Sequence, residues 1–284
     1  MFQELNRTLR LTATATLGAA LLLTPAAIGV TLNDDDARPA TDEAGSNLPE
    51  AKELFKAMLN AMGGKEAFDK IKSTYVVAEM NTPMGDMKME SRFANPDKFL
   101  MEQDVPGMGR QRMGSDGKVG WMHNPMMGYD LIDSEQLEGM TRQANMHMML
   151  LQFDDEFEEM TTIERAEFKG KDCYKVKLVP KEGNGTQHGY FNRESGLLEA
   201  MEIEQRGPQG RGMTMTMEFD EWKEVDDVKL FHKLHIDQMG MRMTMTFTKI
   251  ELNAVDDEVF ELPEQVRALA RERDAQEEDR ESGE

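Results

Sequence analysis

Methionine repeats are the feature of this sequence with the clearest chemical potential. Residues 211–219 and 239–247 place Met at every second position, and each series ends on Phe. Every second side chain of a β-strand points to the same face of its sheet, so each stretch predicts a strand with one Met face and one polar face. The predicted face residues are Met213, Met215, Met217, Phe219, Met239, Met241, Met243, Met245 and Phe247.

Three interpretations of these faces are open. Thioether sulfurs are soft ligands that suit Cu(I), so the first stretch could form a copper site. The faces could instead line an apolar cavity that receives a lipid chain, or they could be an ordinary sheet core. Met adapts to changing shapes, and the chain has 26 Met against 19 aromatic residues (13 Phe, 4 Tyr and 2 Trp). This excess indicates either a poorly specified core or a surface that repacks around ligands.

The energetics of acyl burial also favour the lipid interpretation. Each buried CH₂ group contributes about 0.8 kcal/mol, so a chain of about 15 such groups gains roughly 12 kcal/mol before costs. An apolar trough can therefore hold a lipid without a set of polar contacts. A third alternating segment adds Met87, Met89 and Phe93 to the predicted lipid-binding surface.

Motifs for catalysis or metal binding are missing from the sequence. Ser115 lacks the G-x-S-x-G frame of a nucleophile elbow, and there is no C-x-x-C, H-E-x-x-H or glycine-rich phosphate loop. His232 and His235 are three positions apart, so in a strand they face opposite sides. Cys173, the one cysteine, has no setting that would lower its pKa. The sequence predicts no enzyme, no cofactor and no metal site.

The charge balance restricts the partners. A formal net charge of −21 and a pI of about 4.7 repel nucleic acid and anionic lipid headgroups. We expect neither to bind through electrostatics, and we expect a monomer.

The N-terminus has the pattern of an export signal. Arg7 and Arg10 precede an apolar run over residues 11–30, with small residues before a cut after Gly29. We predict a signal peptide over residues 1–29 and a disordered acidic leader over residues 30–48. No Cys lies near the cut, so the lipobox of a lipoprotein is missing. The mature protein is expected to be soluble and either periplasmic or otherwise exported.

Two amphipathic helices are predicted among many short strands. The first covers residues 49–62, with Leu54, Phe55 and Met58 on its apolar stripe. The second covers residues 134–151, with Met140 and Met148 on its stripe. Both are expected to act as lids over the Met faces.

The remaining segments predict a mainly β fold of the α+β class. About eleven short antiparallel strands follow one another with short turns, which is typical of a meander. A sheet of this length must curl, so we expect an incomplete β-barrel with helices covering its concave face. The domain is predicted to span residues 49–265, followed by a charged C-terminal tail over residues 266–284.

Several motifs resemble those of a known family, the LolA/LolB-like outer-membrane lipoprotein-sorting proteins. The run Ser115-Asp116-Gly117-Lys118, with Trp121 and Asn124-Pro125, resembles the S-D-G-K-x-x-W-x-x-N-P run of the periplasmic carrier LolA. Residues 93–99 resemble the strand–Arg-Pro-Asn-x-Phe–strand step of that family, except that Asn95 stands where the family has the arginine that helps to hold the lid shut. The resemblance covers about residues 50–265.

The resemblance implies a half-barrel of about eleven strands closed by helices, an apolar cavity for acyl chains, and no catalysis. We therefore predict an exported carrier that binds lipid or lipoprotein acyl chains, with membrane-bound donor and acceptor proteins as candidate partners. The alternative is a sensing or scaffold module of the same fold, and a Met-rich copper-binding protein ranks third.

Overall fold

A computed structural model describes residues 48–281, with gaps at 83–84, 106, 135, 138–156, 182–184 and 207–211. All described residues belong to one compact unit, which spans residues 42–284. The predicted signal peptide and nearly all of the predicted leader lie outside the described residues. Within the part of the chain that the structure describes, no helix has the length and hydropathy needed to span a membrane.

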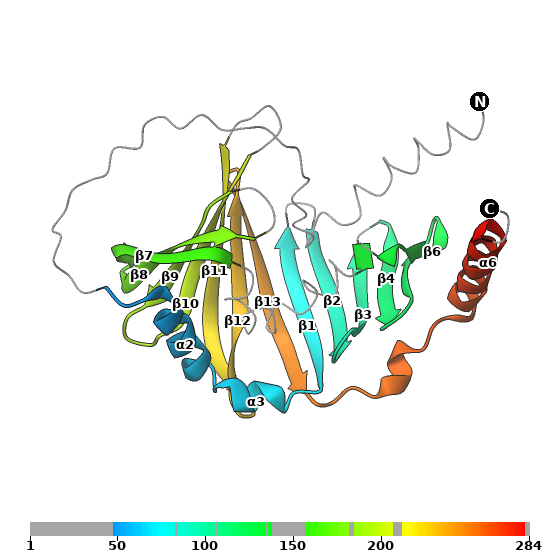
Figure 1. Cartoon of the computed structure of the whole chain (residues 1–284), viewed down its shortest axis with the longest axis horizontal. Coiled ribbons are helices and arrows are strands. Elements are labelled where there is room, and N and C mark those ends of the chain that lie inside the picture. Colours follow the sequence, from blue (N-terminus) through cyan, green and yellow to red (C-terminus); the bar gives the residue numbers. More distant parts are fainter. Residues whose placement is uncertain are drawn as a thin grey trace. The chain divides into compact units, whose positions relative to one another are not determined.

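The described residues form one open, antiparallel sheet of thirteen strands (Figure 1). The sequence predicted about eleven strands, which is two fewer than the structure has. The strands are β1 Ser73–Thr82, β2 Gly85–Ala94, β3 Lys98–Val105, β4 Gly109–Asp116, β5 Gly120–Asn124, β6 Gly128–Ile132, β7 Phe157–Phe168, β8 Lys171–Pro180, β9 Gln187–Asn192, β10 Leu198–Arg206, β11 Gly212–Val225, β12 Val228–Gln238 and β13 Met241–Leu252.

The sheet consists of two meanders rather than one. The strand order is β6-β5-β4-β3-β2-β1-β13-β12-β11-β10-β9-β8-β7, so β1 pairs with β13 and the chain passes from one edge of the sheet to the other between β6 and β7. The prediction of one continuous meander was therefore wrong at this point. As a result, β13 is last in the sequence but central in the sheet.

The helical elements with described bounds are α2 Ala51–Ala61, α3 Lys65–Asp69, the 3₁₀ helix η3 Asp257–Phe260 and α6 Glu264–Glu281, and Ser134, Gln136 and Leu137 are also helical. The predicted end of the domain at residue 265 falls inside the first turn of α6. Val266 and Ala270 of this helix are buried, so the predicted tail begins with residues that belong to the core. The prediction missed them because α6 is highly charged and has only a narrow apolar stripe.

The helices pack on different faces of the sheet. On one side, Phe55 of α2 contacts Phe191 of β9 edge to face, with 4.8 Å between the ring centroids. Near β6, Val266 and Phe260 pack with Leu100 and Trp121, which lie on the opposite face of the sheet. The last helix therefore stabilises the β3–β6 end from the side that α2 does not cover.

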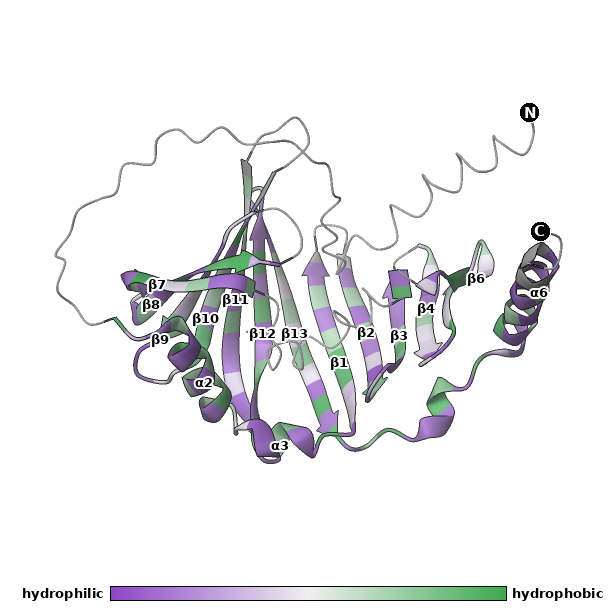
Figure 2. Cartoon of the chain, in the orientation of Figure 1, coloured by the Kyte–Doolittle hydropathy of each residue, from purple (hydrophilic) through white to green (hydrophobic). Residues whose placement is uncertain are grey.

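Alternation along the central strands separates two faces, as the bands along β1, β2, β12 and β13 illustrate (Figure 2). We call one of them the Met face. Its residues, assigned from strand pairing, are Met80, Met87, Met89, Met201, Met213, Met215, Met217, Phe219, Leu234, Ile236, Met243, Met245 and Phe247. The opposite side of the same strands carries Lys, Arg, Asp and Glu.

Candidate functional site

The Met face forms continuous rows across six neighbouring strands. Directly paired residues of an antiparallel sheet point to the same side and pack against each other. The longest row crosses five strands, so four spacings of about 4.8 Å give it a length of roughly 19 Å. One central row consists of Met201, Met217, Ile236 and Met243. The row next to it, which is the longest, consists of Phe219, Leu234, Met245, Met80 and Met87.

Most of the predicted Met-face residues are buried in the folded chain. Phe219 is fully buried, Met215 is 4% exposed and Met217 is 7% exposed. Met213 and Met243, which lie nearer the strand ends, are half-buried. The remaining predicted residues with buried side chains are Met87, Met89, Phe93, Met245 and Phe247. Burial of this kind fits a covered apolar surface and also fits a packed core.

Two predicted residues lie away from the buried rows. Met239 does not belong to a strand, because it forms the two-residue turn between β12 and β13 together with Gly240. The prediction of a strand beginning at Met239 was therefore wrong. Met239 is 73% exposed and Met241, the first residue of β13, is 54% exposed. Both side chains lie at the tip of the hairpin.

An aromatic cluster supports one end of the Met face. The ring of Phe231 on β12 contacts Phe219 with 5.1 Å between centroids and contacts Phe247 with 5.4 Å, both edge to face. Phe231 is fully buried. The sequence analysis missed this residue because the alternation along β12 assigns Leu230 and Leu234, not Phe231, to the Met face. The aromatic residue types alone were the available signal.

Two glutamines place amide groups among the Met side chains. Gln103 and Gln111 pair directly on β3 and β4, on the same side of the sheet as Met89. The Gln103 Nε2 group donates to the sulfur of Met87 at 3.3 Å, a weak acceptor. The Nε2 group of Gln111 is buried and has no hydrogen-bond partner within the part of the chain that the structure describes. A buried amide donor without a partner costs free energy unless another acceptor reaches it.

Of the two predicted lid helices, only α2 can be placed. Phe55 and Met58 are buried and Leu54 is half-buried, so the predicted apolar stripe faces the protein. Phe191, the partner of Phe55, lies on the same side of the sheet as Met201. Thus α2 packs against β9 on this side of the sheet. Met140 and Met148, predicted for the second lid helix, lie outside the described residues.

Asn95 has a structural role in this fold. Its backbone N–H donates to the carbonyl of Lys72 at 3.0 Å, and its side-chain Nδ2 donates to the carbonyl of Ile71 at 2.8 Å. These bonds tie the β2–β3 turn to the segment between α3 and β1. The position that the resemblance associates with lid closure therefore secures a turn here.

Cys173 lies within a small apolar cluster with Tyr190 and Ala200. Its side chain is fully buried. Burial, together with the nearby Glu199 carboxylate, raises the pKa of the thiol to about 11. Since the thiolate is the reactive form, this raised pKa disfavours a reactive role for Cys173.

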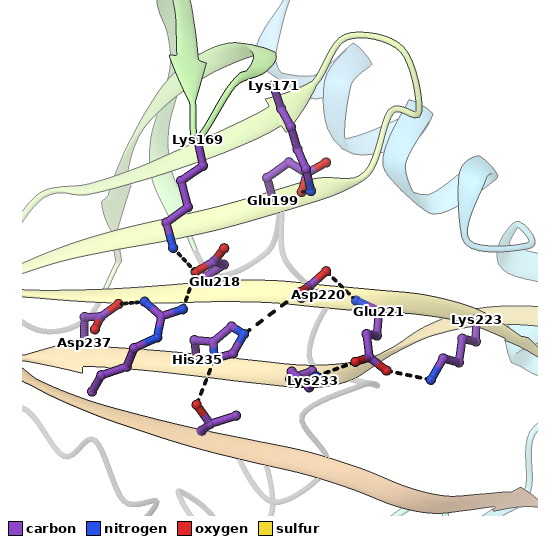
Figure 3. A network of polar contacts seen from close by, with 12 residues as sticks. Lys169, Lys171, Glu199, Glu218, Asp220, Glu221, Lys223, Lys233, His235 and Asp237 are labelled. Atoms are coloured by element: carbon purple, nitrogen blue, oxygen red, sulfur yellow. Dashed lines mark hydrogen bonds and ion pairs between the residues drawn. The ribbon is translucent and has the colours of Figure 1, made fainter.

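The opposite face of β10–β13 carries a network of ion pairs (Figure 3). Glu218 accepts hydrogen bonds from Lys169 and, at 2.9 Å, from Arg242, and Arg242 also binds Asp237 at 2.7 Å. His235 lies beside this network, with its Nδ1 2.9 Å from the Thr244 hydroxyl. Burial, with the nearby Arg242, lowers the pKa of His235. No group of three or more His, Cys, Asp or Glu side chains that could hold a metal ion exists within the described ranges.

The network makes a testable contribution to stability. Burial alone would raise the pKa of Glu218, but the hydrogen bonds from Lys169 and Arg242 outweigh it and lower the pKa. A carboxyl group with a lowered folded-state pKa stabilises the protein above its unfolded-state pKa, and this contribution is lost as the pH falls through the folded-state value. We expect Glu218→Gln to lower the free energy of unfolding at pH 7 by about 1–3 kcal/mol.

Urea denaturation between pH 7 and pH 3 tests this expectation. The difference between wild type and Glu218→Gln should shrink as the pH falls. Glu251→Gln is the control, because Glu251 forms only an exposed pair with Lys249 and should change stability by less than about 0.5 kcal/mol. A difference between wild type and Glu218→Gln that is constant over this pH range would contradict the assignment.

Comparisons with solved structures identify the fold. A DUF1329 family protein from Desulfovibrio piger is similar with a TM-score of 0.52 and 14% identity, over 75% of this chain and 98% of that chain. A LolA superfamily protein from Nitrosomonas europaea is similar with a TM-score of 0.51 and 11% identity, over 76% of this chain and 99% of that one. No family model and no curated protein matches the sequence.

The chain therefore has a LolA-like fold, as the sequence motifs predicted. The predicted class, a mainly β protein built on one curved and open antiparallel sheet, is confirmed. At these identities the likeness concerns the fold alone.

Proposed function

We propose that this protein is an exported carrier that binds the acyl chains of lipids or lipoproteins on its Met face. The observation that supports this most strongly is the continuous row of apolar side chains from β11 to β2, in which Met predominates. Val and Ile have stiff side chains, whereas Met can repack around a bound chain and close on itself after release. The protein acts without catalysis and works as a monomer in the periplasm.

The polar end of the bound lipid lies toward Gln103 and Gln111 in this proposal. The acyl chain follows the Met row, and an ester or amide carbonyl at its end accepts a hydrogen bond from the Nε2 group of Gln111, which has no partner among the described residues. The helix α2 and the segment over residues 134–151 serve as lids. Membrane-bound donor and acceptor proteins supply and receive the cargo.

Native mass spectrometry of protein purified from its own host tests the proposal. We expect a stoichiometric acyl lipid, which solvent extraction releases and identifies. A bound copper ion in place of lipid would favour the thioether site, since Met213, Met215 and Met217 offer soft ligands on one face. Protein that contains neither lipid nor copper would contradict the carrier function. The Met face would then be an ordinary packed core.

A further inference from the structure

Exposed methionines gather in the turns of this protein. Seven large hydrophobic side chains are strongly exposed among the described residues, and five of them are Met. We call these five the Met edge: Met108, Met126, Met127, Met239 and Met241. Their exposed fractions reach 75% for Met126 and 73% for Met239. Contiguous exposed apolar side chains mark interaction sites more often than scattered ones do.

Strand pairing places all five at the same end of the sheet. Met108 lies in the β3–β4 turn, Met126 and Met127 lie in the β5–β6 turn, and Met239 and Met241 lie at the β12–β13 turn. Because β13 pairs with β1 in antiparallel fashion, the start of β13 lies beside the end of β1, and the other two turns close hairpins at that same end. This end is uppermost in Figure 1.

Two of the turns lie side by side. A Cβ atom placed on Gly109 would lie 3.3 Å from Cγ of Pro125, so the β3–β4 and β5–β6 turns are in close contact. Met108 and the pair Met126–Met127 therefore lie on adjacent turns, and the β12–β13 tip lies three to four strands from β3 along the same end.

The turns are well formed, and their geometry does not require Met. Asn124 accepts hydrogen bonds from the backbone N–H of Met126, at 2.9 Å to its Oδ1, and of Met127, at 3.1 Å to its carbonyl. Met239 has a φ of 52°, a conformation in which such two-residue turns favour Asn. Neither core packing nor turn formation explains a Met at these positions, so its apolar side chain is itself the feature to explain.

Charge at this edge indicates the kind of surface that it fits. Residues 105–109, 124–129 and 238–241 contain no charged side chain, although 31% of the chain is charged. Asp104, Asp130 and Asp237 flank the three tips, and Arg110 and Arg242 flank two of them, where they pair with Asp104 at 3.7 Å and with Asp237 at 2.7 Å. The edge is thus an uncharged apolar rim, flanked by charges of both signs, on a protein with a net charge of −21. The acidic protein as a whole repels anionic lipids, whereas the uncharged rim suits zwitterionic headgroups, which carry no net charge.

We propose that the Met edge docks on a bilayer surface of zwitterionic phospholipid, with the five Met side chains inserted among the headgroups. Binding of this kind scales with the buried apolar area and the electrostatic match. The proposal goes beyond acyl binding on the Met face and does not depend on it. Docking in this orientation would bring β13, which leads from Met241 to Met243 and Met245, next to the membrane.

Flotation with phosphatidylethanolamine–phosphatidylcholine vesicles tests the docking. We expect the wild-type protein, purified as the host exports it, to float with these vesicles and to lose binding as phosphatidylglycerol is added. The double variants Met126→Ser/Met127→Ser and Met239→Ser/Met241→Ser should each weaken partitioning by about tenfold or more. The control Ile163→Ser/Val259→Ser removes two other exposed apolar side chains, 41% and 37% exposed, that lie away from this edge, and it should bind as the wild type does.

Four outcomes would overturn the proposal. In the first three, the wild type fails to float, the edge variants float as well as the wild type, or the control variant loses as much binding as the edge variants. The fourth outcome is a wild-type dimer that becomes a monomer in the edge variants, because a second copy of the chain would then cover the edge. Circular dichroism verifies that each variant is folded. Native mass spectrometry of the same variants separates this test from that of the carrier, since edge variants should retain their bound lipid.

Discussion

Phe231→Ala should lower the free energy of unfolding by about 3–5 kcal/mol, because it leaves a cavity in a fully buried aromatic cluster. The ring of Phe231 joins Phe219 of β11 to Phe247 of β13 through two edge-to-face contacts. Pairs of this geometry contribute about 0.5–1.5 kcal/mol beyond the burial of their area. Urea denaturation followed by tryptophan fluorescence measures the change.

Two further variants make this result specific. Phe231→Leu retains most of the volume and should cost less than Phe231→Ala, whereas Ile163→Ala removes an exposed side chain and should cost less than about 0.5 kcal/mol. A loss below about 1 kcal/mol for Phe231→Ala would show that the site collapses around the deletion. The cluster would then not support the Met face in the way we infer.

Local patterning predicted the faces of the central strands well. The Thr–Met alternation from Met213 to Phe219 and from Met243 to Phe247 places buried and polar side chains on the sides that the structure has. This succeeds because the period of a strand is fixed by its backbone and needs no knowledge of its neighbours. The motifs at residues 115–125 predicted the LolA-like fold, which the composition alone did not indicate.

Pairing over long sequence distances could not be predicted in this way. The contact of β1 with β13 joins residues that are more than 160 positions apart, such as Thr74 and Leu252. Alternation determines which side a residue faces but not which strand lies next to it. The sequence therefore indicated the surface and not its central position in the sheet.

Met239 illustrates a different limit. A two-residue turn does not interrupt the alternation of Met with other residues along the sequence. The alternation therefore continues through Met239 and Gly240, although β12 has already ended. The glycine at the second turn position was the available signal. Exposure at this tip follows from where the hairpin ends, which local periodicity does not encode.

Met243→Glu should abolish acyl-chain binding while the domain stays folded. Met243 is half-buried and belongs to the row with Met201, Met217 and Ile236. In the empty protein a carboxylate at this position can reach water, but a bound acyl chain would strip that water away. The penalty for leaving a charge against hydrocarbon is several kcal/mol, so we expect affinity to fall by about 100-fold or more.

The neighbouring residues provide a deeper variant and a matched control. Met215→Glu introduces the same charge at a position that is only 4% exposed, so it should bind no lipid and also lose some stability. Thr214→Glu adds the same charge one residue away, where the exposed side chain points to the opposite face. It should leave lipid affinity unchanged.

Titration of these three variants with a fluorescent fatty acid, alongside their urea denaturation curves, tests the acyl-binding function of the Met face most directly. We expect Met243→Glu to fold and to lose binding, Met215→Glu to lose binding with a lower midpoint, and Thr214→Glu to match the wild type. Wild-type affinity in both Met variants, or unfolding of both without any binding by the wild type, would contradict a lipid site and identify the Met face as a packed core.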